Sequence, residues 1–330
     1  FVPSVINIDD ITWIQELTEQ ATLLDIPQED YLGVMVNYRL YPSLGFTAAM
    51  DMGIVNLLGI SINKDNIYAP QFIDIMNTWY GYPNIPIAFV KDGIEDVRPR
   101  DYGEDVSKYE DKNGYKFARS ISNYSSIPES VSFYRKILAT QPDSSVVLIS
   151  VGFFTNLPRL LDSPADNISP LTGKELVVRK IKTLSLMAGN FNGTNPHLES
   201  ARRTFDEWPT PIIVSPFEVG KAIPFPSKVI ENDLNYVENH PLKIAYESYH
   251  PMPYNRPTWD LTSLLYVVEP DKNYFEESEK GIITVDSLGG TSFKPKSNGN
   301  HIYLKVDSMQ CKSIKRRFVE LIKQKPYLIQ

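Results

Sequence analysis

The sequence predicts an α/β fold: an open, mostly parallel, doubly wound sheet with a β-hairpin added near the C-terminus. Two observations lead to this prediction. Short apolar, β-branched runs recur through the first two thirds of the chain, and amphipathic stretches with helical spacing separate them. Runs that are apolar throughout are typical of strands buried on both faces. Their alternation with helices is typical of parallel βα units whose sheet is covered on both sides.

The individual elements follow from these patterns. The apolar runs predict six core strands, over residues 32–36, 56–62, 85–90, 145–151, 181–188 and 211–215. The amphipathic stretches predict helices over residues 69–80, 131–140, 157–163 and 199–208, and a later helix begins near Trp259. Residues 281–286 and 301–306 are interpreted as a hairpin pair around a turn rich in Gly, Ser and Asn, within a C-terminal addition over 281–306.

Two further segments lie outside the core pattern. Residues 1–31 are expected to form an N-terminal helical extension, because apolar residues follow Asp10, a good N-cap residue, with helical spacing. Residues 93–125 are charged and rich in turn residues, which is typical of an insertion at the rim of a binding site. We expect residues 1–330 to form a single domain, because open α/β sheets reach this length.

Composition excludes several classes of function. The chain is 42% hydrophobic, enough for a large core, and its net charge of −7 comes without a basic stripe for a nucleic-acid backbone. A C-terminal group of Lys312, Lys315, Arg316 and Arg317 has helical spacing and is interpreted as a solvated helix face. No apolar run approaches the ~20 residues that a membrane-spanning helix needs. We therefore expect a soluble protein without nucleic-acid or membrane partners.

The compartment stays open from the sequence. The single cysteine, Cys311, excludes an internal disulfide, but exported proteins can also lack disulfides. The chain begins at Phe1 rather than Met, and two origins explain this start. Either an export signal was removed, as in a periplasmic protein, or the sequence was trimmed.

Functional residues are expected just after the strands, because ligands of open parallel sheets bind beyond the carboxyl ends of the strands. Four motifs there occur in the order that resembles the nucleoside hydrolase family of the inosine/uridine-preferring type. They are Val-Val-Leu-Ile-Ser-Val-Gly-Phe-Phe-Thr-Asn-Leu at 146–157, the strand over 181–189 with Asn190, the segment 208–220, and Arg-Pro-Thr-Trp-Asp at 256–260. The resemblance extends over roughly residues 33 to 306.

The resemblance implies calcium-dependent hydrolysis of the N-glycosidic bond of ribonucleosides. In the family, an aspartate-rich loop after the first strand holds calcium, an ion that takes six to eight oxygen ligands. The ion lowers the pKa of a bound water, and a neighbouring Asp takes its proton before the water attacks the anomeric carbon. Family members often form dimers or tetramers, so a homo-oligomer is among the assemblies that the resemblance allows.

The loop after the first strand departs from this pattern. The resemblance places Asn37, Arg39 and Ser43 where the family has its catalytic and calcium-binding aspartates. A guanidinium does not deprotonate in proteins, and Arg39 would bring its own positive charge to the place of the metal. We therefore expect the calcium site to be lost, no other cofactor to replace it, and the family activity to be impaired or altered.

Other positions keep the family pattern. Asp260 matches a late calcium ligand, and Val151 a residue whose backbone carbonyl reaches the metal, but these two alone cannot make a competent calcium site. Asp260 could equally cap its helix or form a salt bridge. Asn156 could bond its own backbone, and Glu218 could serve its helix dipole. The residues expected to bind substrate are Asn63, Asn156, Asn190, Glu218 and Trp259.

The sequence leaves two main functions open, besides an unrelated enzymatic use of the crevice beyond the strand ends. The first is a hydrolase that acts on an N-ribosyl or related glycosidic bond with remodelled groups. The second is a catalytically silent relative that binds a nucleoside or sugar, or that partners another subunit. Fold alone does not decide between them, because function depends on the site rather than on the fold.

Overall fold

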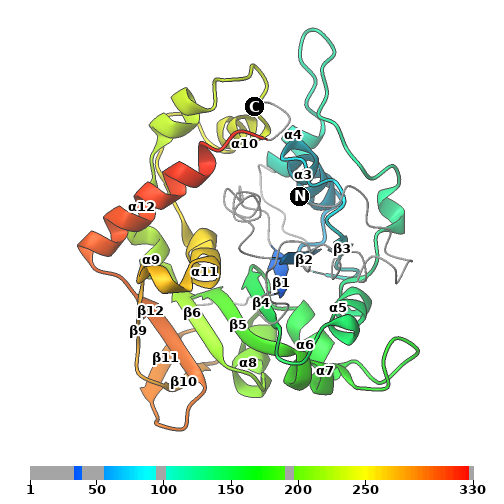
Figure 1. Ribbon diagram of the computed structural model, residues 1–330, viewed down its shortest axis with the longest axis vertical. Helices are drawn as coiled ribbons and strands as arrows, with labels where there is room; N and C mark the ends of the chain where they lie inside the picture. The colour runs from blue at the N-terminus through cyan, green and yellow to red at the C-terminus, as the bar shows by residue number, and fades with distance from the viewer. Residues whose placement is uncertain (1–32, 39–55, 94–101, 190–196, 327–330) are drawn as a thin grey trace, which may run out of the picture.

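A computed structural model describes residues 33–38, 56–93, 102–189 and 197–326, the first of these ranges by its backbone only. A central sheet dominates it (Figure 1). In the described ranges the strand order is β11–β10–β12–β6–β5–β4–β1–β2–β3. The strands that pair in parallel are β1 (Gly33–Tyr38), β2 (Asn56–Ile62), β3 (Ile87–Phe89), β4 (Val146–Val151), β5 (Ile181–Ala188), β6 (Ile212–Pro216) and β12 (His301–Lys305).

The strand order reverses beside β1. The chain runs from β1 to β2 and β3 on one side, and then returns to place β4, β5 and β6 on the other side. The register brings Tyr38, at the end of β1, opposite both Ile62 of β2 and Val151 of β4. The carboxyl ends of β1, β2 and β4 therefore meet at one edge of the sheet, and this reversal is where open α/β sheets bind their ligands.

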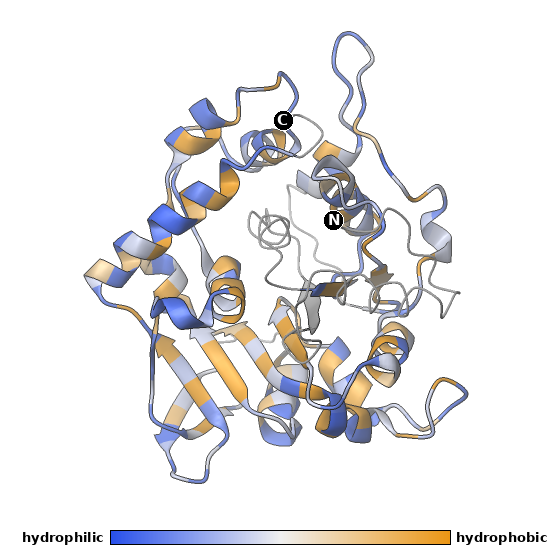
Figure 2. Cartoon of the chain, viewed as in Figure 1, coloured by the Kyte–Doolittle hydropathy of each residue, from blue (hydrophilic) through white to orange (hydrophobic). Residues whose placement is uncertain are grey.

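All six predicted core strands are confirmed, with small differences at their ends. Most side chains of β2, β3, β5 and β6 are buried because helices cover both faces of the sheet, and every residue of β4 is buried. β3 is shorter than predicted and begins after Pro86, which has no N–H to donate to a neighbouring strand. Figure 2 shows hydrophobic residues along the central strands and hydrophilic residues on the outer sides of the helices.

One helical layer packs on each face of the sheet. The first face carries a core cluster shared with α3 (Tyr68–Trp79), α4 (Tyr102–Ser107), α9 (Phe217–Ala222), α10 (Pro241–Tyr249), α11 (Trp259–Val268) and α12 (Ser308–Ile322). The second cluster is shared with α5 (Ser130–Thr140), α6 (Asn156–Asp162), α7 (Gly173–Lys180) and α8 (His197–Glu207). The predicted helices of the sheet layers are thus confirmed, whereas the helix predicted over 10–24 lies outside the described residues.

Short elements connect these layers. β7 (Pro224–Phe225) pairs with β8 (Arg256–Pro257) immediately before α11. β9 (Glu276–Glu277) pairs with β12. The remaining turns are η2 (Tyr124–Ser126), the π-helical η3 (Val229–Asp233) and η4 (Pro270–Lys272). None of the helices in the described ranges is long and apolar enough to cross a bilayer.

The C-terminal hairpin is formed by a different strand from the one predicted. β10 (Gly281–Val285) pairs antiparallel along its length with β11 (Thr291–Pro295), which the sequence analysis did not predict. β12 meets β10 at Gly281 and His301 only, and it extends the main sheet by pairing in parallel with β6. β11 escaped prediction because its polar, lysine-bearing sequence is that of an edge strand rather than a buried one.

Candidate functional site

A hydrogen bond across the end of β1 defines the centre of the candidate site. The backbone N–H of Phe153, in the loop after β4, donates to Asn63 Oδ1 at 3.2 Å, just after β2. These two loops flank the end of β1, so the bond closes the edge of the sheet at the reversal of strand order. Asn63 is fully buried, and its Nδ2 has no hydrogen-bond partner among the described residues.

A second polar contact lies on the α5 side of the same edge. Asn156, the first residue of α6, donates from Nδ2 to Ser61 Oγ at 3.4 Å, and both side chains are fully buried. The buried hydroxyl of Tyr134 in α5 is hydrogen-bonded to the same two side chains, and burial raises the pKa of Tyr134 above its usual value. Asn156 therefore ties α6 to β2 and α5.

Hydroxyl groups fix α11 on the opposite face of the sheet. Ser185 of β5 donates to the backbone carbonyl of Ser263 at 3.1 Å. Ser215 of β6 and Thr262 of α11 share a hydrogen bond at 2.6 Å. Ser215 lies near the carboxyl end of β6 and Ser185 in the middle of β5, so these bonds hold the first half of α11, with Asp260 in its first turn, on the sheet.

Trp259 forms an aromatic pair at the start of α11. Its ring stacks on Phe217 of α9, with 5.4 Å between the ring centroids and an interplanar angle of 22°. The two helices approach closely because position 220 is a glycine: a Cβ there would lie 2.4 Å from Trp259 Cα. Glu218 lies in the first turn of α9, as predicted, and its side chain is exposed.

The predicted site residues fall into four groups. Asn63, Asn156 and Val151 lie at the same edge of the sheet, beside the end of β1. Glu218, Trp259 and Asp260 lie together where α9 meets α11, which packs on β4, β5 and β6. Asn37 is described by its backbone only and pairs in register with Ser61 and Ser150. Arg39, Ser43 and Asn190 lie outside the described residues.

Calcium is the metal that the resemblance implies, and the described donors do not suit it. Asn63, Ser61 and Asn156 offer neutral amides and hydroxyls, and one of the amide oxygens is already bonded to Phe153 N–H. Asp260 is the one carboxylate among the predicted metal ligands. No group of three or more His, Cys, Asp or Glu side chains in the described part of the chain is arranged to hold a metal ion. Calcium sites usually include several carboxylates.

The sequence analysis missed two residues that shape the site. Tyr134 is one, because its position in a predicted amphipathic helix gave no sign that its hydroxyl reaches Asn156. Phe217 is the other; it was part of the motif over 208–220 but was not identified as the partner of Trp259. In both cases the contact joins two elements of the fold, and only the packing of those elements brings the side chains together.

Comparison with solved structures identifies the fold as nucleoside hydrolase-like. The inosine–uridine-preferring nucleoside hydrolase of Bacillus anthracis aligns over 88% of this chain and 99% of its own, with a TM-score of 0.64 and 17% identity. A purine-preferring ribonucleoside hydrolase from Gardnerella vaginalis aligns over 88% of this chain and 99% of its own, with a TM-score of 0.62 and 15% identity.

A type III effector protein shares this fold over a larger part of the chain. XopQ, solved in complex with adenosine diphosphate ribose, aligns over 98% of this chain and 99% of its own, with a TM-score of 0.59 and 12% identity. No protein-family model and no curated protein matches the sequence. At these identities the likeness establishes the architecture, and the activity has to be argued from the site.

Proposed function

We propose that this chain is a nucleoside hydrolase-fold protein that binds a nucleoside or a related ribosyl compound without the calcium-dependent hydrolysis of the family. One observation carries the proposal: Asn63 is fully buried at the reversal of strand order, and its Nδ2 has no partner among the described residues. A buried donor without an acceptor costs about 1–3 kcal/mol, so a ligand oxygen at this position would be stabilising.

A sugar suits this donor. The hydroxyls of a ribose can accept a hydrogen bond from an amide and donate one in return. The bond from Phe153 N–H to Asn63 Oδ1 fixes the orientation of the amide, so that its NH₂ group is held in place before a ligand arrives. A donor that is fixed in advance loses less entropy on binding than a mobile one.

Binding is favoured over metal-dependent hydrolysis because of the charges at the site. A metal-activated water needs a cation held by several carboxylates and a nearby base. The resemblance instead places an asparagine, an arginine and a serine at Asn37, Arg39 and Ser43, and leaves Asp260 as a single carboxylate. This charge pattern supports a site that recognises a neutral sugar.

A remodelled hydrolase is the second candidate, and the position of Asp260 favours it. This carboxylate lies in the first turn of α11, beside the ring of Trp259, and its Oδ2 is buried. A carboxylate on a helix that packs at the sheet edge could still act as a general base toward a water at the sugar. If the chain is a hydrolase, Asp260→Asn is expected to abolish ribose release. If it only binds its ligand, release is at background both with and without the substitution.

The test combines binding and turnover on the full chain. Calorimetry with inosine, uridine, ribose and adenosine diphosphate ribose is expected to detect binding of at least one compound. An assay for reducing sugar is expected to detect no ribose release from either nucleoside, with calcium or with EDTA. Calcium is expected to leave the melting temperature unchanged.

Each outcome bears on a separate part of the proposal. Ribose release that EDTA abolishes would overturn the loss of the metal site, and release that EDTA does not affect would support the remodelled hydrolase instead. Failure of all four compounds to bind would overturn the assignment of a ribosyl ligand.

A further inference from the structure

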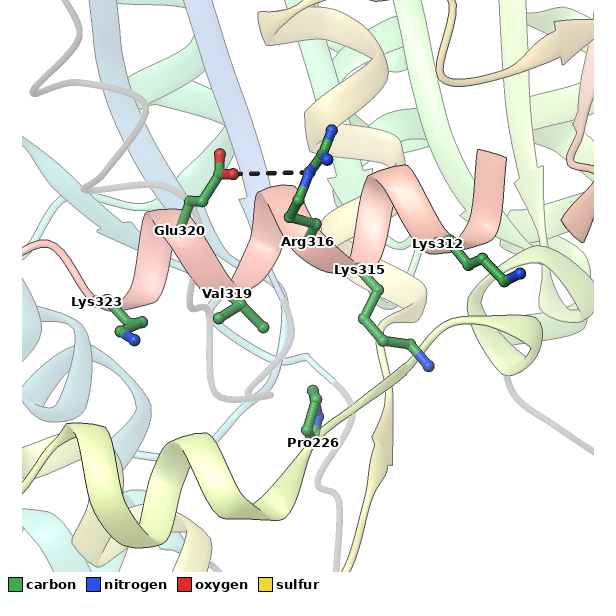
Figure 3. A pocket seen from close by; sticks show the side chains of 7 residues that line it. All are labelled: Pro226, Lys312, Lys315, Arg316, Val319, Glu320 and Lys323. Carbon is green, nitrogen blue, oxygen red and sulfur yellow. Dashed lines mark ion pairs between the residues drawn. The ribbon is translucent and has the colours of Figure 1, made fainter. Parts of the chain in front are cut away.

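A groove runs between α12 and the chain that follows β7. Figure 3 shows Lys315 and Val319 pointing from α12 toward the segment that carries Pro226, with Lys312 and Lys323 at the two ends of the groove. Arg316 and Glu320 also line the groove, and they pair with each other at 3.8 Å, so their charges offset each other. The groove therefore combines two apolar residues, Val319 and Pro226, with the Arg316–Glu320 pair and three lysines.

Two of these lysines have no carboxylate partner in the described part of the chain. The ion pairs of α12 with described residues use Arg316, Arg317, Glu320 and Lys323, the last at 3.2 Å from Asp233. Lys312 and Lys315 are three residues apart on one helix face, where like charges repel each other by a few tenths of a kcal/mol. An anionic partner would relieve this repulsion.

Arg317, on the same helix, differs from these lysines because it forms an ion pair with a buried carboxylate. Its Nη2 lies 2.5 Å from Oε1 of Glu269, whose side chain is 4% exposed. The interpretation of the C-terminal basic group as one solvated face is therefore wrong for Arg317, which points into the protein. Lys312 and Lys315 lie on a different side of α12 from this contact and line the groove.

The sequence contains a segment of complementary charge. Residues 1–31 carry seven of the forty acidic residues and none of the thirty-three basic ones, so residues 32–330 carry thirty-three of each sign. The whole net charge of −7 thus belongs to this segment. Within it, Ile11, Ile14 and Leu17 repeat with helical spacing among the acidic residues, which predicts one apolar face with carboxylates beside it.

We propose that the groove of α12 is the docking site for residues 1–31 of this same chain. The carboxylates of the segment would meet the lysines, and its apolar face would cover Val319 and Pro226. The lengths agree: α12 has 15 residues, and the predicted helix over 10–24 has as many, about 22 Å at ~1.5 Å per residue.

The covalent link to β1 favours the segment over a separate partner. A tethered segment acts at an effective concentration in the millimolar range, so even weak attraction suffices for docking. The apolar part of the groove disfavours a uniformly charged polyanion, and its position between two chain segments keeps it from a flat lipid surface. A second copy of this chain could supply the same residues in exchange, and the experiment separates that case.

Zero-length cross-linking of the full chain tests the proposal. A carbodiimide joins a lysine amine to a carboxylate only when the two groups touch, forming an amide while the reagent takes up the water. Peptide mass spectrometry is expected to find Lys312, Lys315 or Lys323 joined to an acidic residue between positions 9 and 30. The exposed hairpin lysines Lys294 and Lys296 provide the matched control and are expected to give no such product.

A second readout does not depend on the cross-linked lysines. A protease specific for glutamate is expected to cleave after Glu16 and Glu19 at least threefold faster in K312E/K315E than in the unmodified chain or in K294E/K296E. Cross-links to the hairpin lysines at equal yield, or cleavage that K312E/K315E does not accelerate, would overturn the proposal. Cross-links between isotopically light and heavy chains in a mixture would overturn docking within one chain and assign the groove to a second copy.

Discussion

His240 is a buried histidine whose two ring nitrogens are both used in the neutral form. Its Nδ1 accepts a hydrogen bond from the N–H of Leu242 at 3.2 Å and so caps α10, while Nε2 lies 3.0 Å from the hydroxyl of Tyr236. Burial, with a smaller contribution from the charge of Lys243, lowers the pKa of His240 from 6.5 to about 3. His301 is also buried, which lowers its pKa to about 4.

The low pKa of His240 predicts a loss of stability in mild acid. Above about pH 6.5 the ring is neutral in both the folded and the unfolded chain, so the stabilisation is fully present. Below that pH the unfolded chain binds a proton at His240 and the folded chain does not. The free energy of unfolding therefore falls until the pH reaches about 3. His301 contributes in the same direction. Asparagine at position 240 can still accept from Leu242 N–H, because it is a good N-cap residue.

We expect H240N to remove about 2 kcal/mol of the decline in unfolding free energy between pH 7.5 and pH 5. Urea unfolding at several pH values measures this decline, and the part due to His301 is expected to remain. Carboxylates with lowered pKa values, such as Asp166 beside Arg135, titrate below this range and do not interfere. Parallel pH profiles for the variant and the unmodified chain would contradict the assignment.

At the scale of elements, the approach of α9 to α11 depends on Gly220. A Cβ at this position would lie 2.4 Å from Cα and 2.7 Å from N of Trp259, and both of these are backbone atoms that a side-chain rotation cannot move. The same glycine accepts a hydrogen bond from Thr258 N–H at 3.1 Å through its carbonyl. A methyl group here must therefore push the two helices apart.

We expect G220A to lower the free energy of unfolding by about 1–3 kcal/mol. Because the start of α11 carries Trp259 and Asp260, the variant is also expected to bind the ribosyl ligand at least tenfold more weakly, by calorimetry. K221A, on the exposed side of the same helix, is the control and should keep both properties. Equal stability of G220A and K221A would show that the helices can separate without cost.

Asp74 of α3 holds the insertion that was predicted over 93–125. Its Oδ1 accepts from the backbone N–H of Ser120 at 3.0 Å and from Ser120 Oγ at 2.6 Å. Its Oδ2 accepts from Ile121 N–H at 3.0 Å and from the Tyr124 hydroxyl at 2.6 Å. The carboxylate is 1% exposed and faces donors on both oxygens. That the insertion lines the rim of the binding site stays a prediction.

We expect D74N to loosen this insertion, because an amide NH₂ would face donors where a carboxylate oxygen accepted them. Loss of such bonds to a charged group costs about 2–3 kcal/mol. Limited proteolysis with trypsin is expected to cut faster at Lys112 and Lys116. E110Q is the matched control, since Glu110 forms an ion pair with Lys116 in which both side chains are more than half exposed. Unchanged cleavage in D74N would refute the tether.

At the scale of the whole molecule, the buried sheet was predictable and its outer edge was not. Strands such as β4 are apolar throughout because both faces are covered, and that signal is visible in the sequence. β11 is half exposed at the edge of the sheet and has no comparable signal. The parallel pairing of β12 with β6 joins residues about ninety apart, and no local pattern encodes it.

The candidate site was predictable to a similar extent. Strand ends placed Asn63, Asn156 and Val151 at one edge, because parallel strands in register end together. The partners of those residues were not predictable, since Ser61 is 95 positions from Asn156 and only the packing of β2 against α6 joins them. The side of α12 on which Arg317 lies was not predictable either, because it depends on how the helix is rotated against the elements that it packs on.

Ligand binding couples this site to the stability of the whole chain. A compound that binds the folded state alone raises the free energy of unfolding by about 2.7 kcal/mol at a concentration one hundred times Kd. For a chain of 330 residues, whose unfolding entropy is about 2.1 cal/mol/K per residue, that corresponds to a rise in melting temperature of about 4 °C. The ribosyl compound identified by calorimetry should produce this rise.

Asn63 and Asn77 provide a matched pair for this test. Both are buried asparagines whose Nδ2 has no partner among the described residues, but Asn63 lies at the edge of the sheet and Asn77 lies within α3. We expect N63L to abolish the ligand-induced rise in melting temperature and N77L to keep it. N63L also removes the acceptor of Phe153 N–H, so its melting temperature without ligand should fall, by an amount that corresponds to about 1–3 kcal/mol. The comparison therefore rests on the ligand-induced difference within each variant. An equal ligand-induced rise in melting temperature in N63L and N77L would show that the amide of Asn63 stabilises the fold but does not contact the ligand.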